Sequence, residues 1–381
     1  MNKSIYFDNA ATTPVNPEVV ATFSRLSLEI YANPHSNHLL GYQSRDLLVK
    51  ARQQILSLFG LSEHNLIFTS GATESNNLAL QGIALQYRKR GEHLITSAGE
   101  HPSVLNVFYH LRDFYGFSLT VLPLNEQGVI RIKDLVNALN ENTILVSIMA
   151  VNNQTGAINP LNEIAKSIQK WPKCFFHSDI TQAVGKVELD YTLIDLMSFS
   201  AHKIHGFKGS GALIMRKNIT LLPILFGGDQ EDGLRSGTVA VPLDVSLALA
   251  VRLSLEQYLN YIDKIKKIHD WLYDQLVKEE DIIMNSPRAG TAFIINFSLK
   301  SLPASVVVEA LSNAGIMIAS TAACSERKKA ASAVVLAMFD DQKRAKNTMR
   351  ISFSFQNTME EAKIFLHTLK DIFQRLHEAY L

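Results

Sequence analysis

A lysine lies where an apolar strand is expected to end and a glycine-rich loop to begin. The stretch 198–211 reads Ser-Phe-Ser-Ala-His-Lys-Ile-His-Gly-Phe-Lys-Gly-Ser-Gly, with apolar residues on both sides. A lysine just after a strand can reach into a cleft from a rigid backbone, and its amine can form an imine with a carbonyl cofactor. We therefore predict that Lys203 is a Schiff-base lysine, with Ser200 and His202 beside it to bind a phosphate. The alternative is an exposed loop lysine.

Other polar clusters follow predicted strands in the same half of the chain. They are residues 71–73, 100–101, 152–154 and 179–182. Strands that alternate with helices up to residue 216 predict a largely parallel sheet with crossover helices. Because ligands bind at the carboxyl ends of such strands, we expect these clusters to converge on one rim together with residues 200–203.

Several of these side chains suit a phosphorylated aromatic cofactor. Ala72 and Thr73 open a predicted helix at 73–90, whose free N–H groups and dipole attract phosphate, although Thr73 could instead cap the helix. Asp179 could pair with a protonated ring nitrogen and keep the ring an electron sink, or cap a helix. His101 could stack on the ring and move protons near neutral pH.

Three further positions, Arg350, Cys324 and Asn33, lie outside that sheet. Arg350 stands alone among apolar residues of a predicted strand, as a fork for a carboxylate or as a surface salt bridge. Cys324 precedes a basic run that favours its reactive thiolate, in what we expect to be an exposed loop. Asn33 precedes a proline, so its side chain is expected to point into a site or to cap a turn. Cys174, in an apolar strand, is expected to be a core residue.

The composition bounds the class of protein. A chain of 381 residues is too long for one core, so we expect a large domain at 15–256 and a smaller one from 1–14 and 257–381. It is 47% hydrophobic with a net charge of +1, which gives no case for nucleic-acid or membrane binding. No signal peptide is apparent, and two cysteines suit a reducing cytoplasm. The histidines at 202 and 205 lack the partners of a metal site.

Read together, the motifs are specific. They are Thr-Ser-Gly-Ala-Thr-Glu-Ser at 69–75, Glu-His at 100–101, Val-Asn-Asn at 151–153, His-Ser-Asp at 177–179 followed by Gln182, Ser-Ala-His-Lys at 200–203, Arg-Ser-Gly-Thr at 235–238, Ala-Cys-Ser at 323–325 and Arg-Ile-Ser-Phe at 350–353. Over nearly the whole chain this set resembles the cysteine desulfurases, pyridoxal-phosphate enzymes of fold type I in the class V aminotransferase group. The resemblance implies an α/β fold with a mostly parallel sheet in the large domain and a smaller α+β domain.

The resemblance also implies a role for each motif residue. Lys203 would be the covalent anchor of the cofactor, and His101 would stack on the ring and move protons. Asp179 would pair with the ring nitrogen, Gln182 with the ring hydroxyl, and Asn153 would lie beside the ring and the substrate. The phosphate would be held by Ala72, Thr73, Ser200 and His202, with Thr238 from the other subunit of a homodimer. Arg350 and Asn33 would bind the carboxylate of L-cysteine, and Cys324 would accept its sulfur as a persulfide. An acceptor protein for iron–sulfur assembly or tRNA thiolation would then take the sulfur.

Some positions depart from the family pattern. The loop reads Ala-Ser-Thr-Ala-Ala-Cys up to Cys324 where members usually have Ser-Ser-Gly-Ser-Ala-Cys, and an unusual Ser-Glu-Arg-Lys-Lys follows. The chain ends at Leu381 without the tail that housekeeping members use to dock an iron–sulfur scaffold, which leaves the acceptor open and is compatible with a dedicated enzyme, for instance one feeding tRNA thiolation. Two alternatives stay open: a related enzyme that does not need Cys324, such as an aminotransferase or selenocysteine lyase, and a non-catalytic scaffold that binds pyridoxal phosphate.

Overall fold

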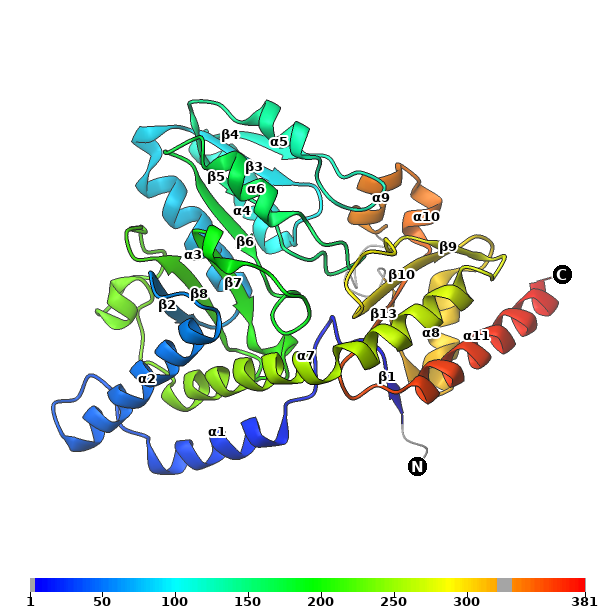
Figure 1. Ribbon diagram of the computed structural model, residues 1–381, viewed down its shortest axis with the longest axis horizontal. Coiled ribbons are helices and arrows are strands. Elements are labelled where there is room, and N and C mark those ends of the chain that lie inside the picture. The colour runs from blue at the N-terminus through cyan, green and yellow to red at the C-terminus, as the bar shows by residue number, and fades with distance from the viewer. Residues whose placement is uncertain (1–3, 321–330, 381) are drawn as a thin grey trace.

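The computed structural model describes residues 4–320 and 331–380, which form a large and a small sheet joined by one long helix (Figure 1). The large sheet has the order β2-β8-β7-β6-β5-β3-β4. Its strands are β2 (His64–Thr69), β3 (His93–Ser97), β4 (Ser118–Leu122), β5 (Thr143–Ser147), β6 (Phe175–Asp179), β7 (Leu196–Ser200) and β8 (Gly211–Arg216). β8 is antiparallel to both neighbours and all other pairs are parallel, which confirms the predicted mostly parallel sheet.

Helices cover both faces of this sheet. One core contains residues of α2 (Leu39–Leu58), α5 (Ile132–Ala138) and α6 (Leu161–Ile168), and the opposite core contains residues of α3 (Ala72–Gln86) and α4 (Pro102–Tyr115). Along β8, Ala212 and Ile214 pack into the first core, whereas Leu213 and Met215 pack into the second. A strand covered on both faces is apolar throughout, which is why these strands read as continuous hydrophobic runs.

The smaller unit is built on an antiparallel sheet of order β12-β13-β10-β9. Its strands are β9 (Ile282–Met284), β10 (Ile294–Leu299), β12 (Ala319–Ser320) and β13 (Thr348–Ser352), while β1 (Ile5–Tyr6) pairs in parallel with β11 (Ile316–Met317). Its helices are α8 (Ala304–Asn313), α10 (Gln342–Lys346) and α11 (Met359–Tyr380). The helix α9 (Ala333–Phe339) instead packs Val334 and Met338 into the core of the large unit. Ile5 and Phe7 belong to the core of the small unit, so the start of the chain packs with its end.

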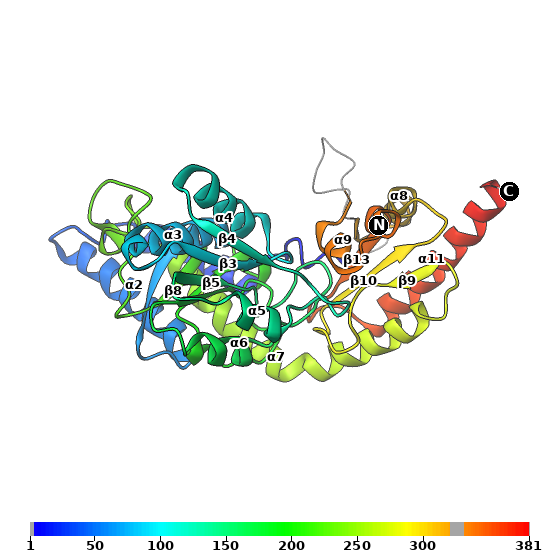
Figure 2. The same ribbon diagram turned by 90° about the horizontal axis from the view of Figure 1, so that it is seen from above.

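The helix α7 (Val241–Leu276) runs past both sheets, while α1 (Pro17–Glu29) packs beside its first half (Figures 1 and 2). Leu247 and Val251 of α7 lie in the core of the large unit, and Ile268 and Leu272 lie in the core of the small one. Buried apolar residues recur along the helix up to Leu276, so it continues without a break from one unit into the other. A domain boundary near residue 256 remains our proposal and would fall inside this helix. No helix among the described residues is long and apolar enough to span a membrane.

The turn between β2 and α3 lies directly against the start of β8. A Cβ atom added at Gly211 would lie 2.5 Å from the Cα of Gly71 and 2.5 Å from the carbonyl oxygen of Phe199. All of these neighbours are backbone atoms, which cannot rotate away as a side chain can. Gly211 therefore permits the approach that places the N-terminus of α3 at the rim of the sheet.

We expect Gly211→Ala to lower the free energy of unfolding by about 1–3 kcal/mol, because overpacking against backbone forces the two segments apart. Thermal and urea unfolding measure this loss. Gly209→Asn is the matched control, since Gly209 has φ 78° with nothing within 4 Å of its added Cβ and asparagine tolerates that conformation. Equal stability of the two variants would contradict the close approach.

Candidate active site

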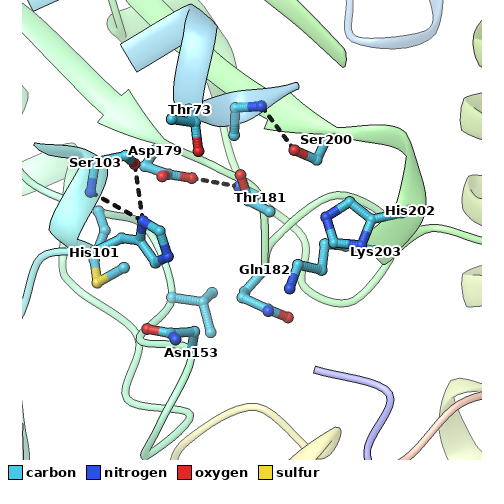
Figure 3. A pocket seen from close by; sticks show the side chains of 13 residues that line it. Thr73, His101, Ser103, Asn153, Asp179, Thr181, Gln182, Ser200, His202 and Lys203 are labelled. Carbon is cyan, nitrogen blue, oxygen red and sulfur yellow. Dashed lines mark hydrogen bonds between the residues drawn. The ribbon is translucent and has the colours of Figure 1, made fainter. Parts of the chain in front are cut away.

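The carboxyl ends of β2, β3, β5, β6 and β7 all lie at the same edge of the large sheet, because β2 and β7 are both antiparallel to β8. A cavity of about 240 Å³ opens there (Figure 3). It is lined by Ala72, Thr73, His101, Ser103, Met149, Val151, Asn153, Asp179, Thr181, Gln182, Ser200, His202 and Lys203. Every residue predicted to bind the cofactor, except Thr238, thus lines one cavity.

Lys203 projects into this cavity from a short 3-10 turn, Ala201–Lys203, that follows β7. Its Nζ donates hydrogen bonds to the carbonyl oxygens of Ala10 (2.8 Å) and Ala11 (2.7 Å). These carbonyls belong to the turn after β1, so the beginning of the chain reaches the centre of the site. The alternative of an exposed loop lysine is wrong, because Lys203 is half-buried and engaged.

The N-terminus of α3 forms one end of the cavity. Its N-cap is Gly71, with φ 147° and no side-chain capping bond, so Thr73 does not cap the helix. The N–H of Ala72 donates to Ser200 Oγ at 2.7 Å, which joins this end to the end of β7. His202 also lines the cavity, and burial together with the charge of Lys203 lowers its pKa to about 4. A neutral histidine, hydroxyls and helix N–H groups make this end suitable for an anion.

A buried carboxylate forms another side of the cavity. Asp179, at the end of β6, is 5% exposed; its Oδ1 accepts from the N–H of Thr181 (3.0 Å) and its Oδ2 from Asn76 Nδ2 (2.9 Å). Asn76 also donates to Ser103 Oγ at 2.9 Å. One amide on the buried side of α3 therefore connects the carboxylate to the start of α4.

His101 is the N-cap of α4 and lies across the cavity from Lys203 (Figure 3). Its Nδ1 accepts from the N–H of Ser103 at 3.2 Å and lies 2.8 Å from Ser103 Oγ. This contact assigns the ring proton to Nε2. Burial, aided by the charge of Lys203 and opposed by Asp179, lowers the pKa of His101 below its usual value. The lowered pKa favours the neutral form of the ring.

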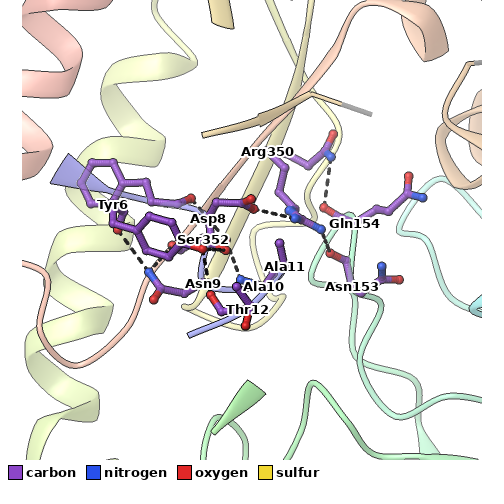
Figure 4. Close-up of polar contacts among 12 residues, drawn as sticks. Tyr6, Asp8, Asn9, Ala10, Ala11, Thr12, Asn153, Gln154, Arg350 and Ser352 are labelled. Atoms are coloured by element: carbon purple, nitrogen blue, oxygen red, sulfur yellow. Dashed lines mark hydrogen bonds and ion pairs between the residues drawn. The ribbon is translucent and has the colours of Figure 1, made fainter. Parts of the chain in front are cut away.

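Arg350 lies beside this cavity on β13 rather than in its wall (Figure 4). Its side chain is only 10% exposed, so it is no surface salt bridge. Nη1 donates to the carbonyl oxygen of Asn153 and Nη2 pairs with Asp8 Oδ1, both at 2.8 Å. Nε is buried without a hydrogen-bond partner among the described residues. The predicted fork for a carboxylate thus already binds one, from Asp8.

The remaining predicted residues lie elsewhere. Asn33 is exposed in the loop between α1 and α2, where its Oδ1 accepts from the N–H of His35 at 2.9 Å, as in a capped turn. Thr238 is exposed and does not line the cavity of its own chain. Cys324 lies outside the described residues. Across residues 4–320 and 331–380, no group of three His, Cys, Asp or Glu side chains is arranged to hold a metal ion.

Sequence reasoning did not single out Ser103, Asn76 or Asp8. Ser103 carries a usable signal, since it follows His101 by two positions at a helix start, where short polar side chains bond to one another. Asn76 and Asp8 carry little local signal, because their partners Asp179 and Arg350 are far away in the chain.

Comparison with known proteins gives a consistent result. Residues 5–365 match the family described as aminotransferase class-V. The chain is 38% identical over 375 residues to a NifS/IcsS protein homolog of Lactobacillus delbrueckii subsp. bulgaricus, covering 97% of both chains. It is 38% identical over 384 residues to a cysteine desulfurase of Homo sapiens, covering 99% of this chain and 83% of that one. It is 34% identical over 380 residues to the cysteine desulfurase IscS of Dictyoglomus turgidum, covering 99% and 96%.

Solved structures agree with these relatives. A NifS-like protein superimposes with a TM-score of 0.90 at 33% identity, covering 97% of this chain and 99% of that one. SspA in complex with cysteine superimposes with a TM-score of 0.78 at 32% identity, covering 92% and 99%. Family match, identity and fold coincide over almost the entire length, and the cavity lies where the family motifs converge. This chain therefore belongs to the aminotransferase class-V family, among relatives named as cysteine desulfurases.

Proposed function

We propose that this protein is a pyridoxal 5'-phosphate-dependent cysteine desulfurase that converts L-cysteine to L-alanine and leaves a persulfide on Cys324. The Cβ–S bond of cysteine breaks, and an S–S bond forms at the Cys324 thiol. The carbon gains hydrogen while the sulfur is oxidised, so cysteine and the thiol balance alanine and the persulfide without an external oxidant or reductant. The names of the curated relatives and of the solved structures support this reaction.

The observation that carries the proposal is the presence of three complementary groups in one cavity. These are the amine of Lys203, the N-terminus of α3 without a side-chain cap, and the buried carboxylate of Asp179. They fit the aldehyde, the phosphate and the ring nitrogen of pyridoxal phosphate respectively. When bound at Lys203, the cofactor supplies an electron sink for the bonds at the substrate Cα.

Side chains of the protein would bind the cofactor and move the proton. Ala72, Thr73, Ser200 and His202 would hold the phosphate, Gln182 the ring hydroxyl, and Asn153 would lie beside ring and substrate. Lys203 Nζ would take the proton from the substrate Cα, since the carbonyl oxygens of Ala10 and Ala11 keep this amine inside the cavity. His101, neutral and protonated on Nε2, would stack on the ring and hold a proton for the same site.

The substrate would be oriented by its carboxylate. Arg350 offers a planar fork next to Asn153, and the Asp8 carboxylate together with the Asn153 carbonyl keeps that fork in place. SspA, with 32% identity to this chain, has been solved in complex with cysteine, which supports cysteine as the substrate class. Asn33, exposed in its own chain, would contribute only in an assembly that brings it to a cavity.

The proposed assembly is a homodimer in the cytoplasm. Thr238 is exposed, so it is available to complete the phosphate site of a second copy. Cys174 is a buried free cysteine, in keeping with a reducing compartment. A sulfur-acceptor protein, either an iron–sulfur scaffold or a tRNA-thiolation enzyme, would then receive the persulfide sulfur.

We expect Cys324→Ser to lower alanine and sulfide release from L-cysteine at least about a hundredfold, because the acceptor thiol is lost. The protein should still bind pyridoxal phosphate and turn yellow. Cys174→Ser is the matched control and should retain activity, since the only other cysteine of the chain is buried in the core. Activity is measured with a thiol reductant present, and the persulfide by labelling without one.

The same assay separates the alternatives. Undiminished alanine release by Cys324→Ser would favour an enzyme that does not need this thiol, such as a lyase or an aminotransferase. A yellow wild type without turnover would favour a scaffold. A wild type that does not bind pyridoxal phosphate would contradict the cofactor site itself.

We expect Arg350→Lys to raise KM for L-cysteine about tenfold or more, because a lysine cannot replace a planar fork that makes two charge-assisted hydrogen bonds. kcat at saturating cysteine should change less. Arg252→Lys, at an exposed pair with Glu256 on α7, is the control and should leave both constants unchanged. An unchanged KM in Arg350→Lys would show that the substrate carboxylate binds elsewhere.

Glu100 directly precedes His101, and its buried carboxyl group interacts electrostatically with Asp179. Its Oε1 accepts from Ser97 Oγ and from the N–H of Met149, both at 2.8 Å, whereas its Oε2 is buried without a partner among the described residues. Burial, opposed by the hydrogen bonds from Met149 and Ser97 and aided by the negative charge of Asp179, raises the pKa of Glu100 to about 8. Because Glu100 is protonated, it adds no second negative charge near Asp179, the carboxylate proposed to pair with the ring nitrogen.

Because the folded state holds this proton up to about pH 8, the stability that Glu100 contributes is fully present below its usual pKa of 4.5 and is lost as pH rises toward 8. We expect Glu100→Gln to remove this loss, so its unfolding temperature should fall less than that of wild type between pH 5 and 8. Glu92→Gln, at an exposed glutamate, is the control. Parallel pH profiles of wild type and Glu100→Gln would contradict a protonated Glu100.

A further inference from the structure

A buried lysine lies behind the proposed cofactor site. Lys186 is 8% exposed and lies in the turns after β6, four residues beyond Gln182. Its Nζ donates to Gln182 Oε1 at 2.8 Å. None of the ion pairs within residues 4–320 and 331–380 includes Lys186. The partner of this buried amine is thus a neutral amide oxygen rather than a carboxylate.

Burying this amine costs free energy, so a role in packing alone does not account for it. Burial, with the charges of Lys203 and Arg350, lowers the pKa of Lys186 to about 7. A buried ionisable amine near two cations and without a carboxylate costs free energy that an apolar side chain of the same length would avoid. Buried groups of this kind concentrate at functional sites.

The amide of Gln182 shows what the lysine does. Its Nε2 donates to the carbonyl oxygen of Ala10 at 3.0 Å, and its Oε1 accepts from Lys186. The two ends of a glutamine amide have nearly the same shape, so its orientation is set by its partners. The carbonyl oxygen of Ala10 can only accept, so the amide atom that faces it must be Nε2, and Oε1 then faces the amine of Lys186, which donates to it. One N–H of Nε2 donates to Ala10, and the second N–H can donate to a ligand in the cavity that Gln182 lines.

We infer that Lys186 is a positioning residue that holds the Gln182 amide with its oxygen turned to Lys186 and its Nε2 left to donate to the bound cofactor. This inference rests on the proposed cofactor site. Lys186 touches neither substrate nor cofactor in this role, because it acts through Gln182. Its donation to Oε1 also polarises the amide, which makes Nε2 a stronger donor to an anionic ring oxygen.

The test is a double-mutant cycle on the full chain with pyridoxal phosphate as the probe. Lys186→Met, Gln182→Ala and the double variant are compared with wild type by the dissociation constant of the cofactor and by the pH midpoint of its visible absorbance. Lys186→Met should weaken binding roughly three- to tenfold, the effect of one hydrogen bond. The midpoint should move to higher pH, because a donor that stabilises the more negative form is weakened; Asp179 and His101 line the same cavity and are unchanged in every variant.

In the Gln182→Ala background, Lys186→Met should have no further effect on either quantity, because the residue through which it acts is absent. Lys186→Arg, which keeps a donor, should restore most of the affinity, and Lys173→Met, at an exposed lysine, should change nothing. Thermal unfolding of the cofactor-free variants shows that they are folded. If the Met variant does not fold, Lys186→Gln takes its place in the cycle.

Two outcomes overturn the inference while the proposed function stands. One is a Lys186→Met variant that binds pyridoxal phosphate like wild type with an unchanged midpoint. The other is a loss of equal size with and without Gln182, which would show a general structural role. A wild type that does not bind pyridoxal phosphate would instead contradict the proposed function, so the two failures are distinguishable.

Discussion

The hydrogen bonds from the Lys203 amine to the carbonyl oxygens of Ala10 and Ala11 connect the large and the small unit at the group proposed to react. Lys203 follows a strand of the large sheet, whereas Ala10 belongs to the core of the small unit. The same Ala10 oxygen accepts from Gln182. The position of the amine therefore depends on how the two cores are held together, and the continuous helix α7 fixes that relation by contributing residues to both.

The rim of the large sheet is held together by hydrogen bonds between polar side chains from different elements. Asp179, Ser103 and Asn76 share hydrogen bonds across two helices and a strand, and Ser200 accepts from the N-terminus of α3. A buried polar group that lacks a partner costs about 1–3 kcal/mol, so each member restrains its neighbours. The site is thus organised before any ligand enters, which is what a site must provide if it is to position a cofactor ring and a substrate together.

The sequence predicts the sheet and the rim well because both follow from local patterns. Apolar runs alternate with helical spacing, and polar residues fall where strands end, so Asp179 and Lys203 are found together in one cavity as predicted. The partners of these residues are not predictable in the same way. Asp8 and Arg350 are 342 positions apart, and neither residue type nor spacing indicates that they meet. Lys186 reads as an ordinary polar residue after a turn, and only the fold shows that it is buried.

The ion pair between Asp8 and Arg350 has a consequence for the proposed reaction. Asp8 already accepts a hydrogen bond from Arg350 Nη2. A substrate carboxylate that binds the same guanidinium must displace or share this bond, so its net binding free energy is smaller than at an unoccupied arginine. Substrate cysteine and product alanine carry the same carboxylate, so a fork that bound it with full strength would retain the product as firmly as the substrate. Uniform tight binding of both would lower KM without accelerating turnover. If Arg350 binds the substrate carboxylate as proposed, competition from Asp8 would weaken the binding of cysteine and alanine alike, and so would help alanine to leave.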